Sequence, residues 1–220
     1  MGTLAGLSSR CMSPNPLVIE RYRRHAAGYD GSAERTMGLR RRAIALLRLQ
    51  PGQTVIDAGA GTGLSYAGLC QGVGARGRVL AFEQSPEMFA LAQARVQREG
   101  WTNVWHVNET AEAVRLPARA DAVLFNYVHD ICSSPAAVAN ILSQLEPGAR
   151  VVMAGMKFLP WWSGPLNLLV WLKCRPYSAR PGDLWQPWSE VAARCTDFTW
   201  APTQGGMGYI ASGILRADVR

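Results

Sequence analysis

The chain has 220 residues, 48% of them hydrophobic, which fits one domain with a substantial core rather than a disordered chain. Its formal net charge of +7 comes almost entirely from arginine and permits an anionic partner without identifying one. No apolar run of about 20 residues and no export leader stand out, and the five dispersed cysteines form no C-x-x-C pair. Membrane spanning, export, a disulfide framework and a metal site are therefore disfavoured, and a cytoplasmic protein is expected.

The N-terminal third predicts helices. Residues 1–16 are small, polar and proline-containing, which predicts a flexible arm, and residues 17–29 predict a short helix that ends at a G-Y-D-G turn. Thr36 to Leu49 reads as an amphipathic helix that Pro51-Gly52 ends. Its apolar side carries Leu39, Ala43, Leu46 and Leu47, and the arginines at 40, 41, 42 and 48 lie elsewhere. We expect a domain from 17 to 220, with residues 17–50 as a helical cap.

Strands and helices then alternate. The pattern predicts a mostly parallel sheet with helices on both faces, and ligands at the carboxyl ends of its strands. A final antiparallel pair completes a seven-stranded α/β fold whose last strand is antiparallel. The expected strands are 54–57, 78–83, 103–107, 121–127, 149–154, 197–201 and 209–215, and the expected helices between them are 64–71, 85–100, 135–145 and 188–195.

Glycines at 59, 61 and 63 follow the first of these strands in Q-T-V-I-D-A-G-A-G-T-G-L. A phosphate-binding loop needs Gly-Lys-Ser/Thr, whereas Gly63 is followed by Leu64, and the spacing also fails the G-x-G-x-x-G dinucleotide pattern. The segment D-A-G-A-G-T-G instead resembles the signature of class I S-adenosylmethionine-dependent methyltransferases. The resemblance implies their Rossmann-like fold, S-adenosyl-L-methionine as cofactor and S-adenosyl-L-homocysteine as product.

The resemblance also implies a set of cofactor-binding residues. Glu83, at the end of the second strand, is expected to accept hydrogen bonds from the two ribose hydroxyls, because a carboxylate offers two acceptor oxygens. After the third strand, V-N-E-T-A-E has Thr110 where the family usually has an acid, and L-E-P-G-A-R-V-V matches the pattern before the fifth strand. The full expected set is Asp57, Gly59, Ala60, Gly61, Gly63, Glu83, Gln84, Met88, Thr110, Ala111, Asn126 and Tyr127.

Catalytic candidates follow the fourth strand and lie in the cap. In F-N-Y-V-H-D, His129 is the candidate base for a hydroxyl acceptor; with an amine or thiol it would only orient the acceptor, and a helix-start histidine paired with Asp130 is an equal alternative. Tyr22 and Tyr29 belong to the segment that folds over the cofactor in many such enzymes. Tyr29, within G-Y-D-G, resembles an element of quinone-biosynthesis methyltransferases, although both tyrosines could be structural.

Five of the eight tryptophans lie in residues 158–188, which we expect to form an acceptor-side insertion. The segment could cover the sheet as core, line an acceptor pocket or contact a membrane surface, and Pro160, Gly164 and Pro165 argue against one continuous helix. The favoured function is methyl transfer to a small or lipid-like, partly apolar acceptor. Alternatives are a nucleic-acid methyltransferase, disfavoured because no RNA-binding module or N-P-P-Y segment is present, and a non-catalytic cofactor-binding protein.

Overall fold

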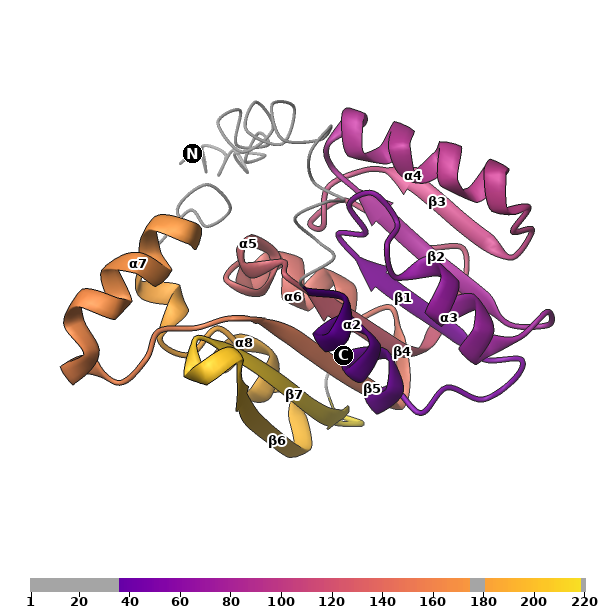
Figure 1. The fold of residues 1–220 in the computed structure, drawn as a ribbon. Coiled ribbons are helices and arrows are strands. Elements are labelled where there is room, and N and C mark those ends of the chain that lie inside the picture. The colour runs from indigo at the N-terminus through magenta and orange to yellow at the C-terminus, as the bar shows by residue number, and fades with distance from the viewer. Residues whose placement is uncertain (1–35, 175–180, 219–220) are drawn as a thin grey trace, which may run out of the picture.

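The computed structural model describes residues 36–174 and 181–218 (Figure 1). They form a seven-stranded sheet in the order β3-β2-β1-β4-β5-β7-β6, in which β7 is antiparallel to both neighbours and the pairs among β1 to β5 are parallel. The expected fold is confirmed. The strands are β1 (Thr54–Ala58), β2 (Arg78–Glu83), β3 (Val104–Asn108), β4 (Ala120–Asn126), β5 (Leu145–Met156), β6 (Cys195–Thr203) and β7 (Gly208–Leu215).

Helices cover both faces of the sheet. The cluster on one face joins Leu39, Tyr66 and Ala92 to β1, β2 and β4, and the cluster on the other joins helices before β5 and β6 to the alternate residues of the same strands. Each inner strand is therefore buried on both sides, as parallel sheets require. The helices are α2 (Met37–Leu46), α3 (Tyr66–Val73), α4 (Pro86–Glu99), α5 (His129–Cys132), α6 (Pro135–Leu142), α7 (Gly164–Cys174) and α8 (Ser189–Ala192).

Local signals fix most helix ends. The Ser85 hydroxyl accepts from the Met88 amide, Pro86 occupies the first turn, and Gly100 ends α4 in the left-handed conformation. Two expected helices are too long, because pairing in the sheet takes their last residues: β5 begins at Leu145, and β6 begins at Cys195. The expected helix at 17–29 lies outside the described residues.

The tryptophan-rich segment is not one continuous helix, as its prolines predicted, because a 3₁₀ turn precedes α7. Gly164 and Pro165 begin α7 rather than interrupt it, because an amide in the first turn has no intrahelical partner to lose. Pro160 precedes a separate 3₁₀ turn, η2 (Trp161–Ser163). In the described part of the chain, no helix is both long and apolar enough to cross a bilayer.

Candidate functional site

The glycine turn at the end of β1 has two packed glycines and one open one. Gly59, Gly61 and Gly63 all have left-handed φ angles, of 63°, 58° and 77°. A Cβ at Gly59 would meet Val128 at 2.7 Å, and a Cβ at Gly63 would meet the Tyr66 ring at 2.6 Å, whereas one at Gly61 would meet nothing within 4 Å. The outer glycines therefore allow close packing, and the middle one leaves space above the backbone.

Glu83 joins this turn to the end of β2. Its Oε2 accepts from the Gly61 amide at 2.9 Å and its Oε1 accepts from the Ser85 amide at 2.8 Å. Burial raises the pKa of Glu83 to about 7, although these backbone donors oppose the rise. The Ala60 amide also donates to Phe82 O at 3.0 Å. The carboxylate is thus held beside the open glycine, with lone pairs left for a further donor.

Asp57 lies buried below the turn. Its Oδ2 has no hydrogen-bond partner among the residues that the structure describes. Burial raises the pKa of Asp57 to about 7, and the charge of Arg40 and a hydrogen bond with Ser65 oppose that rise. An unsatisfied buried carboxylate oxygen is costly and marks a place where a ligand donor would fit.

Arg40 was expected away from the apolar side of its helix, and that expectation is wrong. It is buried, and its Nη1 donates to Ser65 Oγ at 2.6 Å. With the amide of Asn126 turned so that its oxygen faces α2, that oxygen accepts from Arg40 Nη1 at 2.7 Å and from Nη2 at 3.1 Å. The guanidinium therefore links α2 to the start of α3 and the end of β4. Its spacing from Ala43 and Leu47 was the available signal, because i, i+3 and i+7 share a helix face.

Tyr127 directly follows β4 and has a strained conformation, with a φ of 61°. Its hydroxyl accepts from Gln204 Nε2 at 3.0 Å, and its amide donates to Ala154 O at 2.8 Å. Gln204, in the turn between β6 and β7, also has a positive φ, of 50°. No sequence pattern pointed to Gln204, because its contact with Tyr127 joins residues 77 positions apart.

The expected adenine-side residues lie near the ends of β2 and β3. Met88 is buried at the start of α4, and Gln84 donates to Asp130 Oδ2 at 3.3 Å. Burial raises the pKa of Asp130 to about 6. Thr110 begins a turn in which its carbonyl accepts from the Val114 amide, and Ala111 packs into the core.

His129 is buried and its ring is bound to the backbone of β5. Nε2 lies 2.8 Å from Met156 O and 3.0 Å from the Met156 amide nitrogen. Burial lowers the pKa of His129. In this conformation Nε2 orients the end of β5, and taking a proton from an acceptor would require the ring to leave Met156. Tyr22 and Tyr29 lie outside the described residues.

Buried carboxyls give the ligand-free protein a characteristic pH dependence. The pKa values of Asp57 and Glu83 are raised to about 7 in the folded protein, so the unfolded chain loses these protons first as pH rises from 4 to 7. The free energy of unfolding should therefore fall over this range, by about 3 kcal/mol for each of the two carboxyls, and urea denaturation at each pH measures it. Glu83→Gln should flatten the fall, and an unchanged slope in that variant would contradict the assignment.

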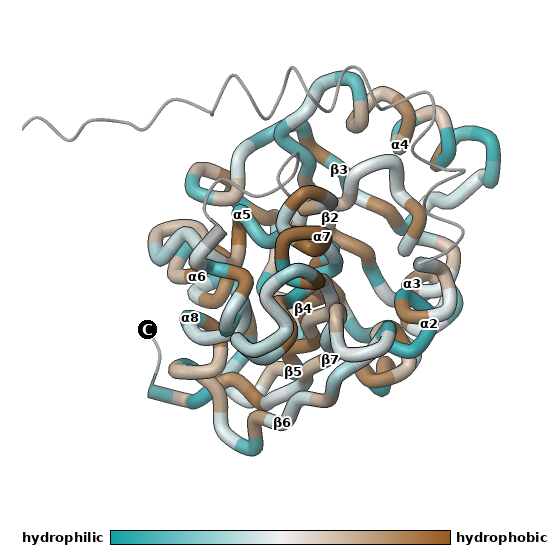
Figure 2. Tube along the Cα trace, turned by 60° about the vertical axis from the view of Figure 1, so that its left-hand side comes forward, coloured by the Kyte–Doolittle hydropathy of each residue, from teal (hydrophilic) through white to brown (hydrophobic). Residues whose placement is uncertain are grey.

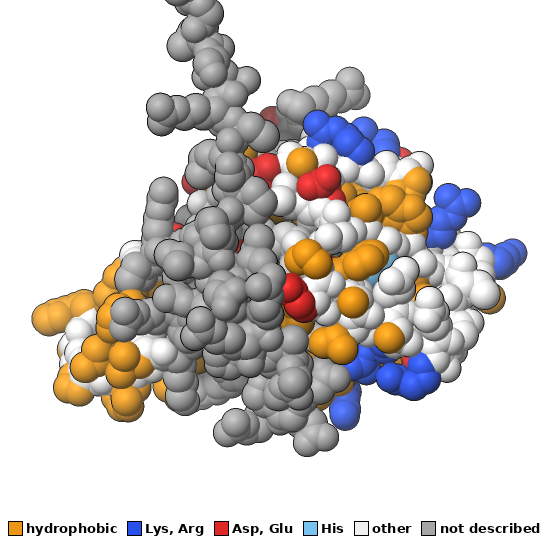
Figure 3. Space-filling model, turned by 90° about the horizontal axis from the view of Figure 1, so that it is seen from above, with side chains coloured by type: hydrophobic (Ala, Val, Ile, Leu, Met, Phe, Trp, Pro, Cys, Tyr) orange, Lys and Arg blue, Asp and Glu red, His pale blue; other side chains and the backbone are white. Residues whose placement is uncertain are grey.

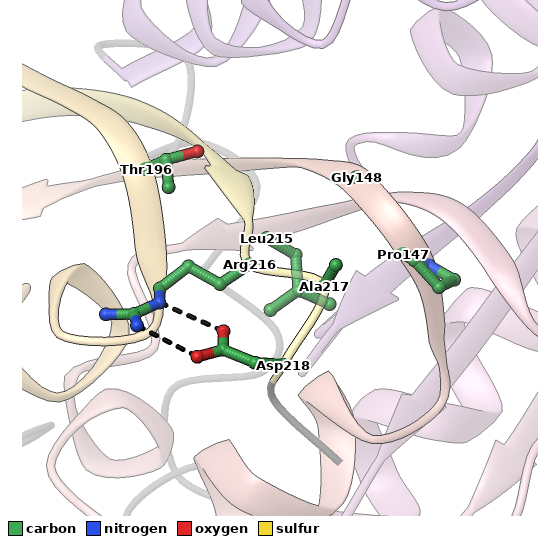
Figure 4. A pocket seen from close by; sticks show the side chains of 7 residues that line it. All are labelled: Pro147, Gly148, Thr196, Leu215, Arg216, Ala217 and Asp218. Carbon is green, nitrogen blue, oxygen red and sulfur yellow. Dashed lines mark hydrogen bonds and ion pairs between the residues drawn. The ribbon is translucent and has the colours of Figure 1, made fainter.

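A separate shallow pocket of about 500 Å³ lies at the opposite edge of the sheet (Figure 4). It is formed around Gly148 at the start of β5 and Leu215 at the end of β7, with the exposed Arg216–Asp218 pair beside it. The ends of β1, β2 and β4, where the buried acids gather, are not part of it. Within residues 36–174 and 181–218, no cluster of His, Cys, Asp and Glu could hold a metal ion.

Sequence comparisons identify relatives over the central sheet. The model of the protein-L-isoaspartate (D-aspartate) O-methyltransferase family matches residues 28–156. A protein-L-isoaspartate O-methyltransferase from Aeropyrum pernix is 32% identical over 51% of this chain and 42% of its own length. A ubiquinone/menaquinone biosynthesis C-methyltransferase from Hydrogenovibrio crunogenus is 28% identical over 52% of this chain and 46% of its own length. The match thus spans less than half the length of these curated relatives.

Structure comparisons agree on the fold. A putative methyltransferase from Bacillus halodurans has a TM-score of 0.63 at 12% identity, covering 80% of this chain and 97% of the other. An N-methyltransferase from Bradyrhizobium japonicum, solved with S-adenosyl-L-homocysteine, has a TM-score of 0.58 at 14% identity over 80% of this chain and 86% of its own. At such identities the likeness shows the methyltransferase fold alone.

Proposed function

The chain belongs to the protein-L-isoaspartate (D-aspartate) O-methyltransferase family, and on this premise we propose that it uses S-adenosyl-L-methionine to methylate an acceptor. The observation that carries the proposal is the hydrogen bond from Gly61 to Glu83, which holds a carboxylate beside an open glycine turn. Asp57 Oδ2, which has no partner among the described residues, supports it, because a cationic, hydroxyl-rich cofactor supplies hydrogen-bond donors for such an oxygen.

The residues present fit the cofactor. Glu83 would accept from the ribose, the turn from Gly59 to Gly63 would let the backbone approach the ligand closely, and Asp57 would accept from a donor of the cofactor. When bound, the cofactor supplies a methyl group on a sulfonium, which the acceptor takes in an in-line displacement as the carbon–sulfur bond breaks. The protein then mainly has to align the acceptor and exclude water.

Two acceptor classes have support. We favour a small or lipid-like, partly apolar molecule, because α7 and its neighbours give the end of β5 a strongly apolar border and residues 158–188 would serve as the acceptor-side insertion. The second is an isoaspartyl carboxylate in a peptide, favoured by the family match. A carboxylate acceptor is already ionised at neutral pH and needs no base, which agrees with the bound state of the His129 Nε2.

Two further roles remain proposals. His129 would act as base only for a hydroxyl acceptor, and with other acceptors it would orient the end of β5. Tyr22 and Tyr29 would close over the cofactor from the N-terminal cap. Methylation of RNA and cofactor binding without transfer are the remaining alternatives, and the experiment below distinguishes them.

Methyl transfer from labelled cofactor should be measured with an isoaspartyl peptide, a lipid and metabolite extract, and RNA as separate acceptors. We expect label in an apolar product of the extract. Label in the peptide alone would establish the second class, label in RNA alone would overturn both, and calorimetric cofactor binding without transfer would indicate a binding protein.

With a hydroxyl acceptor, His129→Ala should lower turnover by about 10²-fold or more at unchanged cofactor affinity. With a carboxylate acceptor, the loss should be below about tenfold, since no proton is removed.

A further inference from the structure

Helix α7 buries Asn167 and exposes its leucines. Asn167 is buried, its Oδ1 accepts from the Leu159 amide at 2.8 Å, and its Nδ2 donates to Leu159 O at 3.0 Å. Val170 and Cys174 share this inner face and pack with Phe158 in a small satellite cluster. Trp171 packs against the edge of this cluster, whereas the leucines of the helix lie outside it.

The outer surface, here called the α7 face, consists of residues that are between 49% and 78% exposed. Figure 3 shows them gathered at one end of the molecule, and Figure 2 shows α7 as one of its brown, hydrophobic segments. From Phe158 to Leu172 the sequence has no charged residue. The α7 face comprises Trp161, Trp162, Leu166, Leu168, Leu169 and Leu172.

The four leucines form one continuous surface. At 100° per residue, Leu166, Leu168, Leu169 and Leu172 fall within an arc of roughly 160°, opposite the arc of Asn167. The two tryptophans of η2 adjoin the start of the helix and contact each other edge to face. Soluble surfaces rarely leave so many large apolar side chains together, so this face is built to be covered.

We propose that the α7 face docks on the surface of an anionic lipid bilayer. A helix of 11 residues is about 16 Å long, which is too short to span a bilayer but long enough to lie in its interface. Tryptophan and leucine are side chains that favour this region. The helix follows β5, so docking brings the carboxyl edge of the sheet, with the glycine turn, towards the lipid (Figure 1).

Charge selects the bilayer over a second copy of the chain. Each molecule has a formal net charge of +7, so two copies repel each other, whereas a surface of anionic headgroups attracts the protein. The uncharged α7 face would then enter the interface without burying an unpaired charge. The proposal concerns this surface alone, so vesicle binding can succeed or fail independently of cofactor binding and methyl transfer.

Sedimentation with vesicles tests the proposal. We expect the full chain to bind vesicles of phosphatidylcholine with 30% phosphatidylserine, and the double variant Leu168→Glu, Leu169→Glu to bind at least about tenfold more weakly. Leu91→Glu is the matched control, because Leu91 is 43% exposed on α4 and should leave binding unchanged. The proposal would be overturned if the double variant bound vesicles as strongly as the wild type, or if the wild type did not bind them.

Two measurements keep the result interpretable. Circular dichroism should show both variants folded, since exposed side chains contribute little to stability. Light scattering should show a monomer, and a dimer that the double variant abolishes would overturn the proposal in favour of self-association. Quenching of tryptophan fluorescence by brominated lipids should decrease when Trp161 and Trp162 are replaced by Phe, and equal quenching would place the contact elsewhere.

Discussion

Replacing Glu83 by Ala is expected to weaken binding of S-adenosyl-L-methionine by about a hundredfold or more. The carboxylate is buried at the end of β2 and faces the open glycine of the turn, where two ribose hydroxyls would donate to it. Each hydrogen bond to a charged group contributes about 1.5–3 kcal/mol, so losing both has a large effect. Isothermal titration calorimetry of the wild type and the variant measures the difference.

Two control variants sharpen this prediction. Glu83→Gln keeps one acceptor oxygen and should lose about tenfold in affinity, between the wild type and Glu83→Ala. Glu99→Ala removes a carboxylate from the far end of α4 and should leave affinity unchanged. Wild-type affinity in folded Glu83→Ala would mean that the ribose assignment is wrong. A loss of cofactor affinity in Glu83→Ala, Glu83→Gln and Glu99→Ala alike would instead indicate a general electrostatic effect.

The fold was predictable because local and global signals agree. Short apolar runs predicted the strands, and the serine and proline at 85 and 86 predicted the start of α4. The errors occur where pairing in the sheet decides an end, as at Leu145 and Cys195. Such pairing depends on neighbours far away in the sequence, so propensity alone could not reveal it.

The positions of candidate site residues were predictable where those residues lie at strand ends. Asp57 and Glu83 lie at the ends of β1 and β2, and Tyr127 directly follows β4, so all three lie at one edge of the sheet, as expected. The contacts of Arg40 and Gln204 were not predictable, because each joins distant elements. The α7 face shows a related limit: an apolar pattern indicates that surface will be covered, and only the structure shows that the protein's own core does not cover it.

A pair of glycine substitutions separates the packing role of the turn from its binding role. Gly63→Ala should lower the free energy of unfolding by about 2–4 kcal/mol, because its Cβ would meet the Tyr66 ring at 2.6 Å and its φ is left-handed. Gly61→Ala has the same backbone strain but an open space, so its cost should be about 1 kcal/mol. Urea denaturation measures both.

For cofactor affinity the order of the two substitutions should be reversed, with the larger loss in Gly61→Ala. The methyl of Gly61→Ala would project into the space beside the Gly61–Glu83 hydrogen bond, where the ligand would lie, so cofactor affinity should fall by at least about tenfold at a stability cost of only about 1 kcal/mol. Calorimetry at a temperature where both variants are folded makes the comparison. Unchanged affinity in Gly61→Ala would mean that the ligand does not pass over this glycine. If Gly63→Ala proved as stable as the wild type, the Tyr66 ring must be able to move aside. Packing against Tyr66 would then not explain why position 63 is glycine.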